Sequence, residues 1–147
     1  MDRINERILH QLVRDGRVTN AELASRVGLS PSACLRRVQE LEKSGAIRGY
    51  RAVLDQAVLG NSFAAYIAVG LSSHTKESQR GFEEAIVKSP EVRECQNVTG
   101  AFEYLLRVET KDLAAYKQFH TDVLGVLPQV RTITTHVLME SVKDDRA

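Results

Sequence analysis

The chain contains few cysteines. There are two in 147 residues, Cys34 and Cys95. They lie far apart in the sequence, and neither has the CxxC or Cys/His spacing that is typical of a zinc site. We therefore expect no metal, and two reduced, partly buried thiols of the kind found in cytoplasmic proteins.

Long apolar runs are also missing. The longest, Phe63–Leu71, has nine residues when Gly70 is counted, whereas a membrane-spanning helix needs about 20. The first seven residues, MDRINER, lack the apolar segment of a signal peptide. The expected location is the cytoplasm, without membrane contact.

The chain has no large excess of charge of one sign. Its net charge is +1, but residues 1–54 contain ten Lys and Arg against six Asp and Glu, and residues 55–147 contain ten against thirteen. A basic N-terminal third before an acidic remainder predicts that only the first part contacts phosphate. With 43% hydrophobic residues, the chain can build a packed core.

Signatures of catalysis are absent too. The histidines lie in different predicted elements: His10, His74, His120 and His136. No Ser/His/Asp spacing, P-loop or dinucleotide-binding fingerprint is present. We predict that the protein is not an enzyme and holds no cofactor.

What the sequence does contain is a pair of helix signals around a tight turn. Thr19 is a natural N-cap, and Glu22 completes a capping box. Gly28 then supplies the permissive backbone that ends the first helix. Ser30 caps the next helix, and Pro31 occupies its first position, where the missing N–H has no cost. This order predicts a helix-turn-helix, and hence DNA binding.

The second helix of the pair has one apolar and one polar face. At about 100° per residue, Cys34, Val38 and Leu41 fall together and should pack on the domain. On the polar side, arginine can bond guanine, glutamine can bond adenine, and a serine near the helix N-terminus can bind phosphate. The predicted DNA contacts are Thr19, Ser30, Pro31, Ser32, Arg36, Arg37, Gln39, Lys43 and Arg48. The alternative is that the basic residues merely solvate an exposed face.

A further helix is expected before this pair, from Asp2 to Asp15. Its apolar stripe would consist of Ile4, Ile8, Leu9, Leu12 and Val13. The three helices make a DNA-binding domain over residues 1–46. Residues 47–60 follow as an extended linker strand and hinge, which also serves as a wing. There Arg48 is expected either to contact phosphate or to lie in solvent.

Residues 61–147 repeat the pattern strand, helix, strand. The expected strands cover 61–71, 92–98, 102–109 and 130–140, and the expected helices cover 75–88 and 112–124. This predicts an α+β class protein whose second domain is ferredoxin-like, βαββαβ, with both helices on one face of an antiparallel sheet. The other face needs a second cover, so we expect self-association through the sheet.

Several runs of residues resemble the Lrp/AsnC regulators, the leucine- and asparagine-responsive transcription factors of bacteria and archaea. They are DRINERIL at 2–9, GRVTNAELA at 16–24, VGLSPSACLRRV at 27–38, LEKSGAIRGY at 41–50, ECQNVTGAFEYLLRV at 94–108 and VLME at 137–140. The resemblance implies a winged helix-turn-helix joined to a ligand-binding domain. It also implies dimers through the sheet and linker strand, often assembled into octamers.

In that family the effector site typically forms where dimers meet, around the turn that here begins at Val98. Such a turn suits an amino acid, because glycine lets a ligand approach the backbone and a carboxylate can pair with an ammonium. The predicted contacts are Val98, Thr99, Gly100, Ala101, Phe102, Glu103, Leu113, Thr134 and His136. The alternative is a simple hairpin turn with Gly100 at positive φ. The family usually carries Asp where this chain has Glu103, and the extra methylene moves the carboxylate by about 1.5 Å.

These features together predict a transcriptional regulator in the cytoplasm, associated with the nucleoid. It should bind double-stranded operator DNA, assemble as a dimer or octamer, and respond to a small amino acid. The alternative is an amino-acid-sensing interaction module that does not bind an operator directly. The basic face of the second helix argues against that alternative.

Overall fold

The protein forms two compact units in a computed structural model that describes residues 1–145. The first unit is Met1–Val53, and the second begins at Leu54. The division falls inside the segment 47–60 that the sequence marks as a linker. Among the described residues, no helix is long and apolar enough to cross a membrane.

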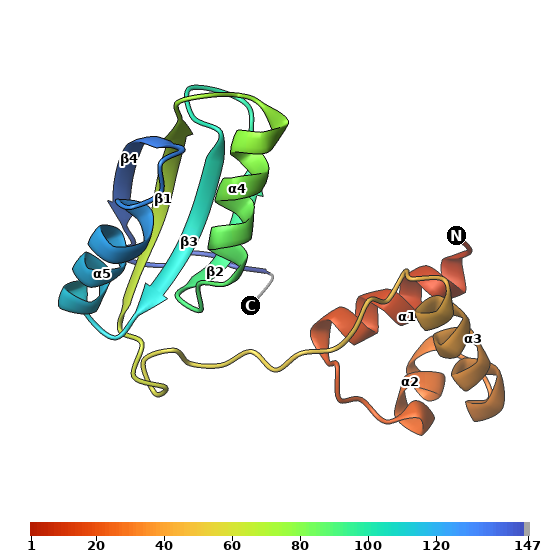
Figure 1. The fold of residues 1–147 in the computed structure, drawn as a ribbon. Helices are drawn as coiled ribbons and strands as arrows, with labels where there is room; N and C mark the ends of the chain where they lie inside the picture. Colours follow the sequence, from red (N-terminus) through yellow and green to blue (C-terminus); the bar gives the residue numbers. More distant parts are fainter. Residues whose placement is uncertain (146–147) are drawn as a thin grey trace. The chain divides into compact units, whose positions relative to one another are not determined.

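The first unit is made of three helices (Figure 1). They are α1 (Arg3–Arg14), α2 (Asn20–Val27) and α3 (Pro31–Lys43). The predicted side-chain caps are all present: Asp2, Thr19 and Ser30 accept the N–H of the residue three positions later. Gly28 ends α2 with φ +77°, a conformation that favours glycine. Local capping chemistry therefore sets where these helices begin and end.

The core of this unit joins one face of each helix. Its buried members are Ile8, Leu23, Ala24, Val27, Cys34 and Leu41. The apolar stripe predicted for α1 is wrong at one position, because Val13 is 80% exposed. At about 100° per residue, Val13 lies roughly opposite Ile4 on the helix, and so it points away from α2 and α3.

The segment predicted as a linker strand pairs with no strand of the described chain. Residues 48–55 have no regular secondary structure, and residues 56–60 form a turn. A strand needs a neighbouring strand to accept its backbone hydrogen bonds. The four-stranded sheet of the second unit does not include this segment, so a neighbouring strand for residues 47–54 would have to come from a second copy of the chain.

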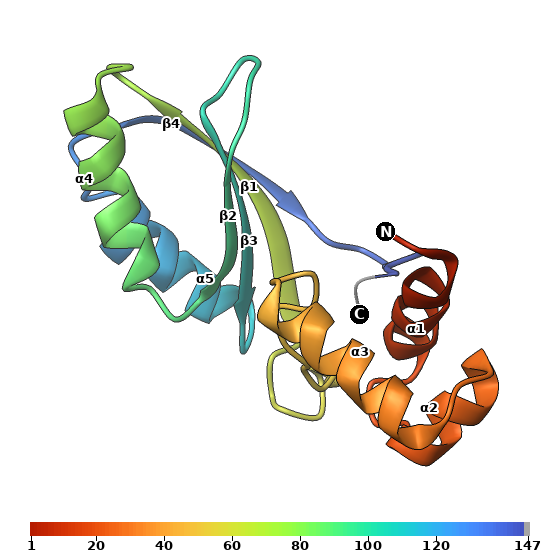
Figure 2. The ribbon, with the colours of Figure 1, turned by 90° about the vertical axis from the view of Figure 1, so that its right-hand side faces the viewer.

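The second unit is a four-stranded sheet covered on one face by helices (Figure 2). The strands are β1 (Phe63–Leu71), β2 (Val92–Asn97), β3 (Tyr104–Thr110) and β4 (Val130–Val137), in the order β2-β3-β1-β4. All neighbouring strands are antiparallel. The helices are α4 (Lys76–Val87) and α5 (Leu113–Phe119), which continues into a π-helical turn, η1 (His120–Leu124). The predicted ferredoxin-like fold is confirmed.

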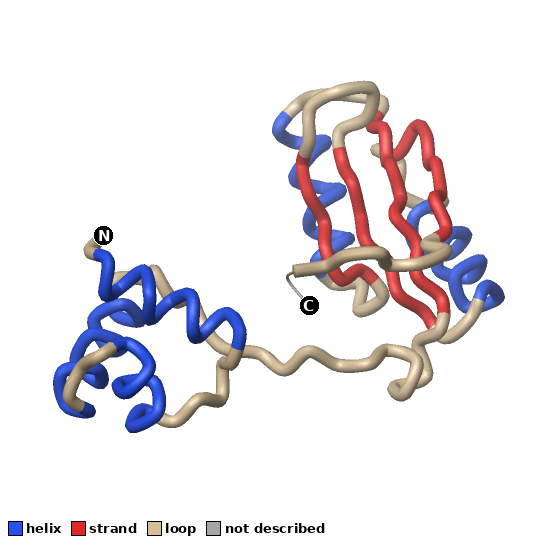
Figure 3. The backbone as a smooth tube through the Cα atoms, turned by 180° about the vertical axis from the view of Figure 1, so that it is seen from behind, coloured by secondary structure: helices blue, strands red, loops and turns tan. Residues whose placement is uncertain are grey.

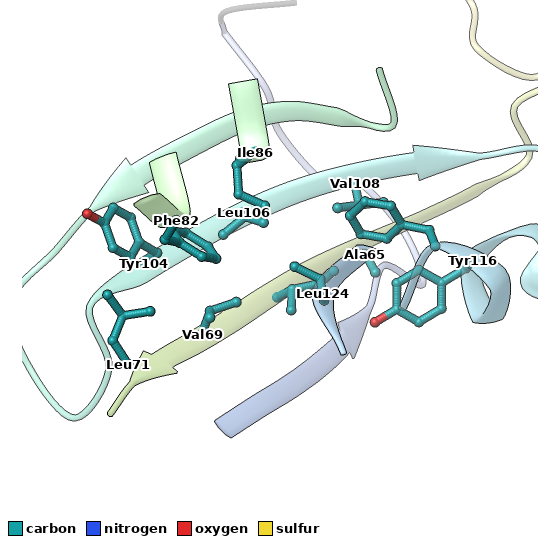
Figure 4. Packing of buried hydrophobic residues seen from close by; sticks show 12 residues of the cluster. Ala65, Val69, Leu71, Phe82, Ile86, Tyr104, Leu106, Val108, Tyr116 and Leu124 are labelled. Carbon is teal, nitrogen blue, oxygen red and sulfur yellow. The ribbon is translucent and has the colours of Figure 1, made fainter. Parts of the chain in front are cut away.

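Alternation along the strands separates a buried face from an open face. On β3 every second residue from Tyr104 to Thr110 is buried. These side chains meet β1 and the helices in one core that includes Phe82, Ile86 and Leu124 (Figure 4). The residues between them point the other way, toward the face opposite α4 and α5 (Figure 3).

Candidate DNA-binding face and effector site

The outer face of α3 is open to solvent and polar. Its exposed residues include Ser32, Arg36, Gln39 and Lys43. The Arg36 side chain is 68% exposed, and its Nη1 lies 3.2 Å from Glu40 Oε1 one turn along the helix. An exposed pair of this type contributes little free energy, so Arg36 can exchange Glu40 for another acceptor.

Hydroxyl groups flank the start of this face. Thr19 and Ser30 accept backbone N–H groups as N-caps, at 3.2 and 3.3 Å. A hydroxyl that accepts a hydrogen bond still has its own O–H to donate. Because both residues are exposed, these hydroxyls can donate to phosphate oxygens at the N-termini of α2 and α3.

Arg37 has a different environment from its neighbour Arg36. Its side chain is 23% exposed, and its Nη1 donates to Asp2 Oδ2 at 2.6 Å and to Asn5 Oδ1 at 2.9 Å. The hydrogen bond from Arg37 also lowers the pKa of the Asp2 carboxyl. The Arg37 side chain therefore connects α3 to the start of α1. The sequence could not show this pairing, because its partners lie more than thirty residues away.

The turn between α2 and α3 is held by a side chain that no sequence pattern had marked. Asn20 Nδ2 donates to the Pro31 carbonyl oxygen at 2.8 Å. This bond ties the first residue of α2 to the first residue of α3, and so sets how the two helices are held. Arg48 lies in the exposed segment that follows α3.

The predicted effector turn is the loop between β2 and β3. The Val98 N–H donates to the Glu103 carbonyl oxygen at 2.9 Å, which closes the loop. Gly100 has φ +123°, and a Cβ built there meets no atom within 4 Å. Thr99, Gly100 and Ala101 are exposed. The loop is a hairpin turn with Gly100 at positive φ, and the backbone at Gly100 is open to solvent, as a ligand would require.

The Glu103 carboxylate, from the residue just before β3, lies beside a bulge in β1. The pairing of β1 with β4 shifts its register between Gly70 and Leu71. The Leu71 N–H donates to Glu103 Oε2 at 2.7 Å, and His74 Nδ1 lies 3.1 Å from Oε1. The Glu103 side chain is only 15% exposed. Its carboxylate is therefore held against the backbone, with one oxygen covered by a histidine.

Thr132 belongs to the same neighbourhood. A Cβ at Gly70 would lie 2.3 Å from Thr132 Oγ1 and 3.7 Å from Glu103 Oε2. Glycine at this position thus leaves room for the hydroxyl and the carboxylate to face each other. Neither Thr132 nor His74 was selected from the sequence as a candidate, although both lie near the Glu103 carboxylate. The signal was Gly70 inside an apolar strand, since such a glycine marks a bulge or a close approach.

The remaining predicted effector residues are spread over the sheet. Thr134 and His136 are exposed on β4, opposite Ala68 and Tyr66 of β1. Leu113 begins α5 and is 63% exposed. Leu113 follows the end of β3, whereas Glu103 precedes its start. Within one chain, Leu113 and the predicted effector turn therefore lie at opposite ends of this strand.

A hollow of about 520 Å³ lies where β2 begins and β3 ends, away from the Gly100 turn. Its lining includes Arg93, Glu109, Lys111 and Phe119, and none of the predicted effector residues contributes to it. Among the described residues, no three His, Cys, Asp or Glu side chains are grouped to hold a metal ion.

Comparison with known proteins decides the family. Residues 1–48 match the winged helix-turn-helix DNA-binding family, and residues 64–147 match the Lrp/AsnC ligand binding domain. The chain belongs to the Lrp/AsnC family. It is 41% identical to the leucine-responsive regulatory protein of Escherichia coli over 143 residues, which cover 97% of this chain and 87% of the relative.

Solved structures agree with this family assignment. A transcriptional regulator from Neisseria meningitidis, crystallised with L-Met, superimposes with a TM-score of 0.94 at 34% identity, covering 98% of this chain and 93% of that one. An AsnC family regulator from Agrobacterium tumefaciens gives 0.91 at 34% identity, with 98% and 94% covered. This Lrp/AsnC protein is thus a DNA-binding transcriptional regulator, and the relatives it resembles are regulators rather than enzymes.

Proposed function

We propose that this regulator binds operator DNA through the outer face of α3 and changes its assembly or DNA binding when a small amino acid binds near Gly100 and Glu103. The observation that carries the DNA-binding part is the solvent-exposed face of Ser32, Arg36, Gln39 and Lys43. Its guanidinium, amide and ammonium groups suit base edges and phosphates in a major groove. Residues 1–46 would form the reader, 47–60 the linker and 61–147 the effector domain.

The amino-acid part is supported by chemistry at the bulge of β1. Glu103 offers a carboxylate to an α-ammonium, and the Gly100 loop offers open backbone to an α-carboxylate. The neighbour from Neisseria meningitidis was crystallised with an amino acid, L-Met. A small amino acid is therefore the effector class that fits, with L-Met as the first candidate.

Self-association is part of the proposal. The open face of the sheet carries Tyr66 and Arg107, with Arg107 Nη1 bonded to the Tyr66 hydroxyl at 3.0 Å. Neither α4 nor α5 covers this face (Figure 3), and an uncovered sheet face favours association with a second copy. We propose a dimer at least, with dimers meeting at the Gly100 turn in an octamer. This arrangement would bring a partner's Leu113, Thr134 or His136 to the ligand.

A panel experiment tests the effector part. Thermal unfolding would be followed with each of the twenty amino acids, because a ligand that binds the native state raises its stability by mass action. We expect one or a few amino acids to raise the melting temperature in a concentration-dependent manner. No shift with any of them, at millimolar concentrations, would contradict an amino-acid effector.

A further inference from the structure

The two polar contacts of the Glu103 carboxylate differ in how readily they are replaced. The Leu71 N–H that reaches Oε2 belongs to the backbone of β1 and is fixed by the sheet. The contact to Oε1 comes from His74, whose side chain is 76% exposed. Exposed polar contacts contribute little net free energy in water, whether or not the histidine is charged. His74 is therefore the more readily replaced of the two contacts.

The backbone that carries His74 is held by its neighbours. Ser73 Oγ accepts the Thr75 N–H at 3.4 Å, and Thr75 Oγ1 accepts the Ser78 N–H at 3.2 Å as the N-cap of α4. These bonds fix the chain on the helix side of His74, while β1 fixes it on the other. The imidazole is thus the movable part, and it can rotate off Glu103 without rearranging the fold.

A second polar group faces the same carboxylate. The Thr132 side chain is exposed, and its Oγ1 lies beside Gly70. Gly70 keeps the space between this hydroxyl and the carboxylate open. A carboxylate and a hydroxyl are both acceptors for an ammonium N–H, so the two groups are able to accept from one cation, with His74 beside one carboxylate oxygen.

We propose that His74 competes with the α-ammonium of the effector for Glu103 Oε1, and that Thr132 supplies a further acceptor to that ammonium. This inference rests on the amino-acid effector proposed above. His74 then sets the amino-acid concentration at which the regulator responds. Removing the imidazole should strengthen binding, whereas removing the Thr132 hydroxyl should weaken it.

The test is isothermal titration of the full chain with L-Met, in four proteins: wild type, His74→Ala, Thr132→Val and His10→Ala. His10 is an exposed histidine on α1, in the other unit, and its variant is the matched control. Thr132→Val keeps the branched shape and removes the hydroxyl. His74→Ala should bind more tightly than wild type, by up to about fivefold, the factor that corresponds to the loss of one exposed polar contact. Thr132→Val should bind more weakly, and His10→Ala should match wild type.

The outcomes separate this inference from the function on which it rests. The inference is supported if His74→Ala binds L-Met more tightly than wild type while Thr132→Val binds it more weakly and His10→Ala is unchanged. Binding of L-Met that is measurable only in His74→Ala also supports the role of His74, and equal binding by Thr132→Val and wild type overturns the role of Thr132. Equal or weaker binding by His74→Ala, with clear binding by wild type, overturns the role of His74 and leaves the effector site intact. If L-Met and the other nineteen amino acids bind neither wild type nor His74→Ala, the proposed effector function itself is wrong.

Discussion

Arg36 and Arg37 are neighbours in sequence, yet their guanidinium groups have different surroundings. Arg36 is open to solvent beside Glu40, whereas Arg37 is bonded to Asp2 and Asn5 of α1. We therefore expect Arg36 to act mainly in DNA recognition. Arg37 should act mainly by holding α3 against α1. Any contact of Arg37 with DNA would have to be made while its guanidinium stays bonded to Asp2 and Asn5.

Replacing Arg36 with alanine should weaken operator binding without lowering stability. If Arg36 reads a base, the cost is roughly 1–3 kcal/mol, and preference at one operator position is relaxed. Fluorescence anisotropy with operator variants measures both effects, and thermal unfolding serves as the control. Wild-type affinity for every variant duplex would show that Arg36 does not read the groove.

Replacing Arg37 with alanine should lower stability. The change leaves Asp2 and Asn5 without their shared donor. Because the hydrogen bond from Arg37 lowers the pKa of the Asp2 carboxyl from its usual 3.8, the Asp2 part of the stabilisation is present above pH 3.8 and is lost as the pH falls through the lowered value, whereas the Asn5 part does not titrate. Urea unfolding at pH 7 and at pH 3 checks this, and an equal difference at both values would contradict it.

At the scale of the element, local chemistry could be predicted from the sequence and contacts between elements could not. The caps at Thr19 and Ser30 each depend on a residue three positions away, and both were predicted. The Glu103 contact to Leu71 depends on how β3 and β1 align, which no local pattern specifies. For the same reason the extended pattern at 47–54 does not by itself specify a strand, because a strand also needs a neighbour, and pairing with a second copy stays a prediction.

The loop between β2 and β3 can be tested as an element with Gly100→Val. At φ +123° a branched side chain is strained, and it would fill the approach to the backbone. We expect amino-acid-induced stabilisation to disappear while effector-free operator binding stays close to wild type. Differential scanning fluorimetry and gel shift would measure the two properties.

A matched control for this variant is Gly60→Val. Gly60 also has positive φ, +84°, with open space around its Cβ position, but it lies in the turn at 56–60. The Gly60→Val variant therefore introduces backbone strain of the same kind at a site outside the hairpin. Loss of the amino-acid response in both variants would point to general strain. Retention in Gly100→Val would place the ligand elsewhere.

At the scale of the whole molecule, the uncovered sheet face predicts self-association. We expect light scattering at micromolar concentration to give at least a dimer of the 16.4 kDa chain, and an octamer if dimers meet at the Gly100 turn. Operators should then be pseudo-palindromic, with half-sites about one helical turn apart or a multiple of it. A stable monomer at this concentration would contradict the assembly.

The central claim is that a basic helix face reads DNA under the control of an amino acid. It is tested most directly by selecting duplexes from a random library and then titrating the selected and scrambled sequences at several salt concentrations, with and without L-Met. We predict tight binding to the selected duplex that weakens steeply with salt, and a change in affinity or stoichiometry when L-Met is added. Equal, weak binding to both sequences, unchanged by L-Met, would contradict the account.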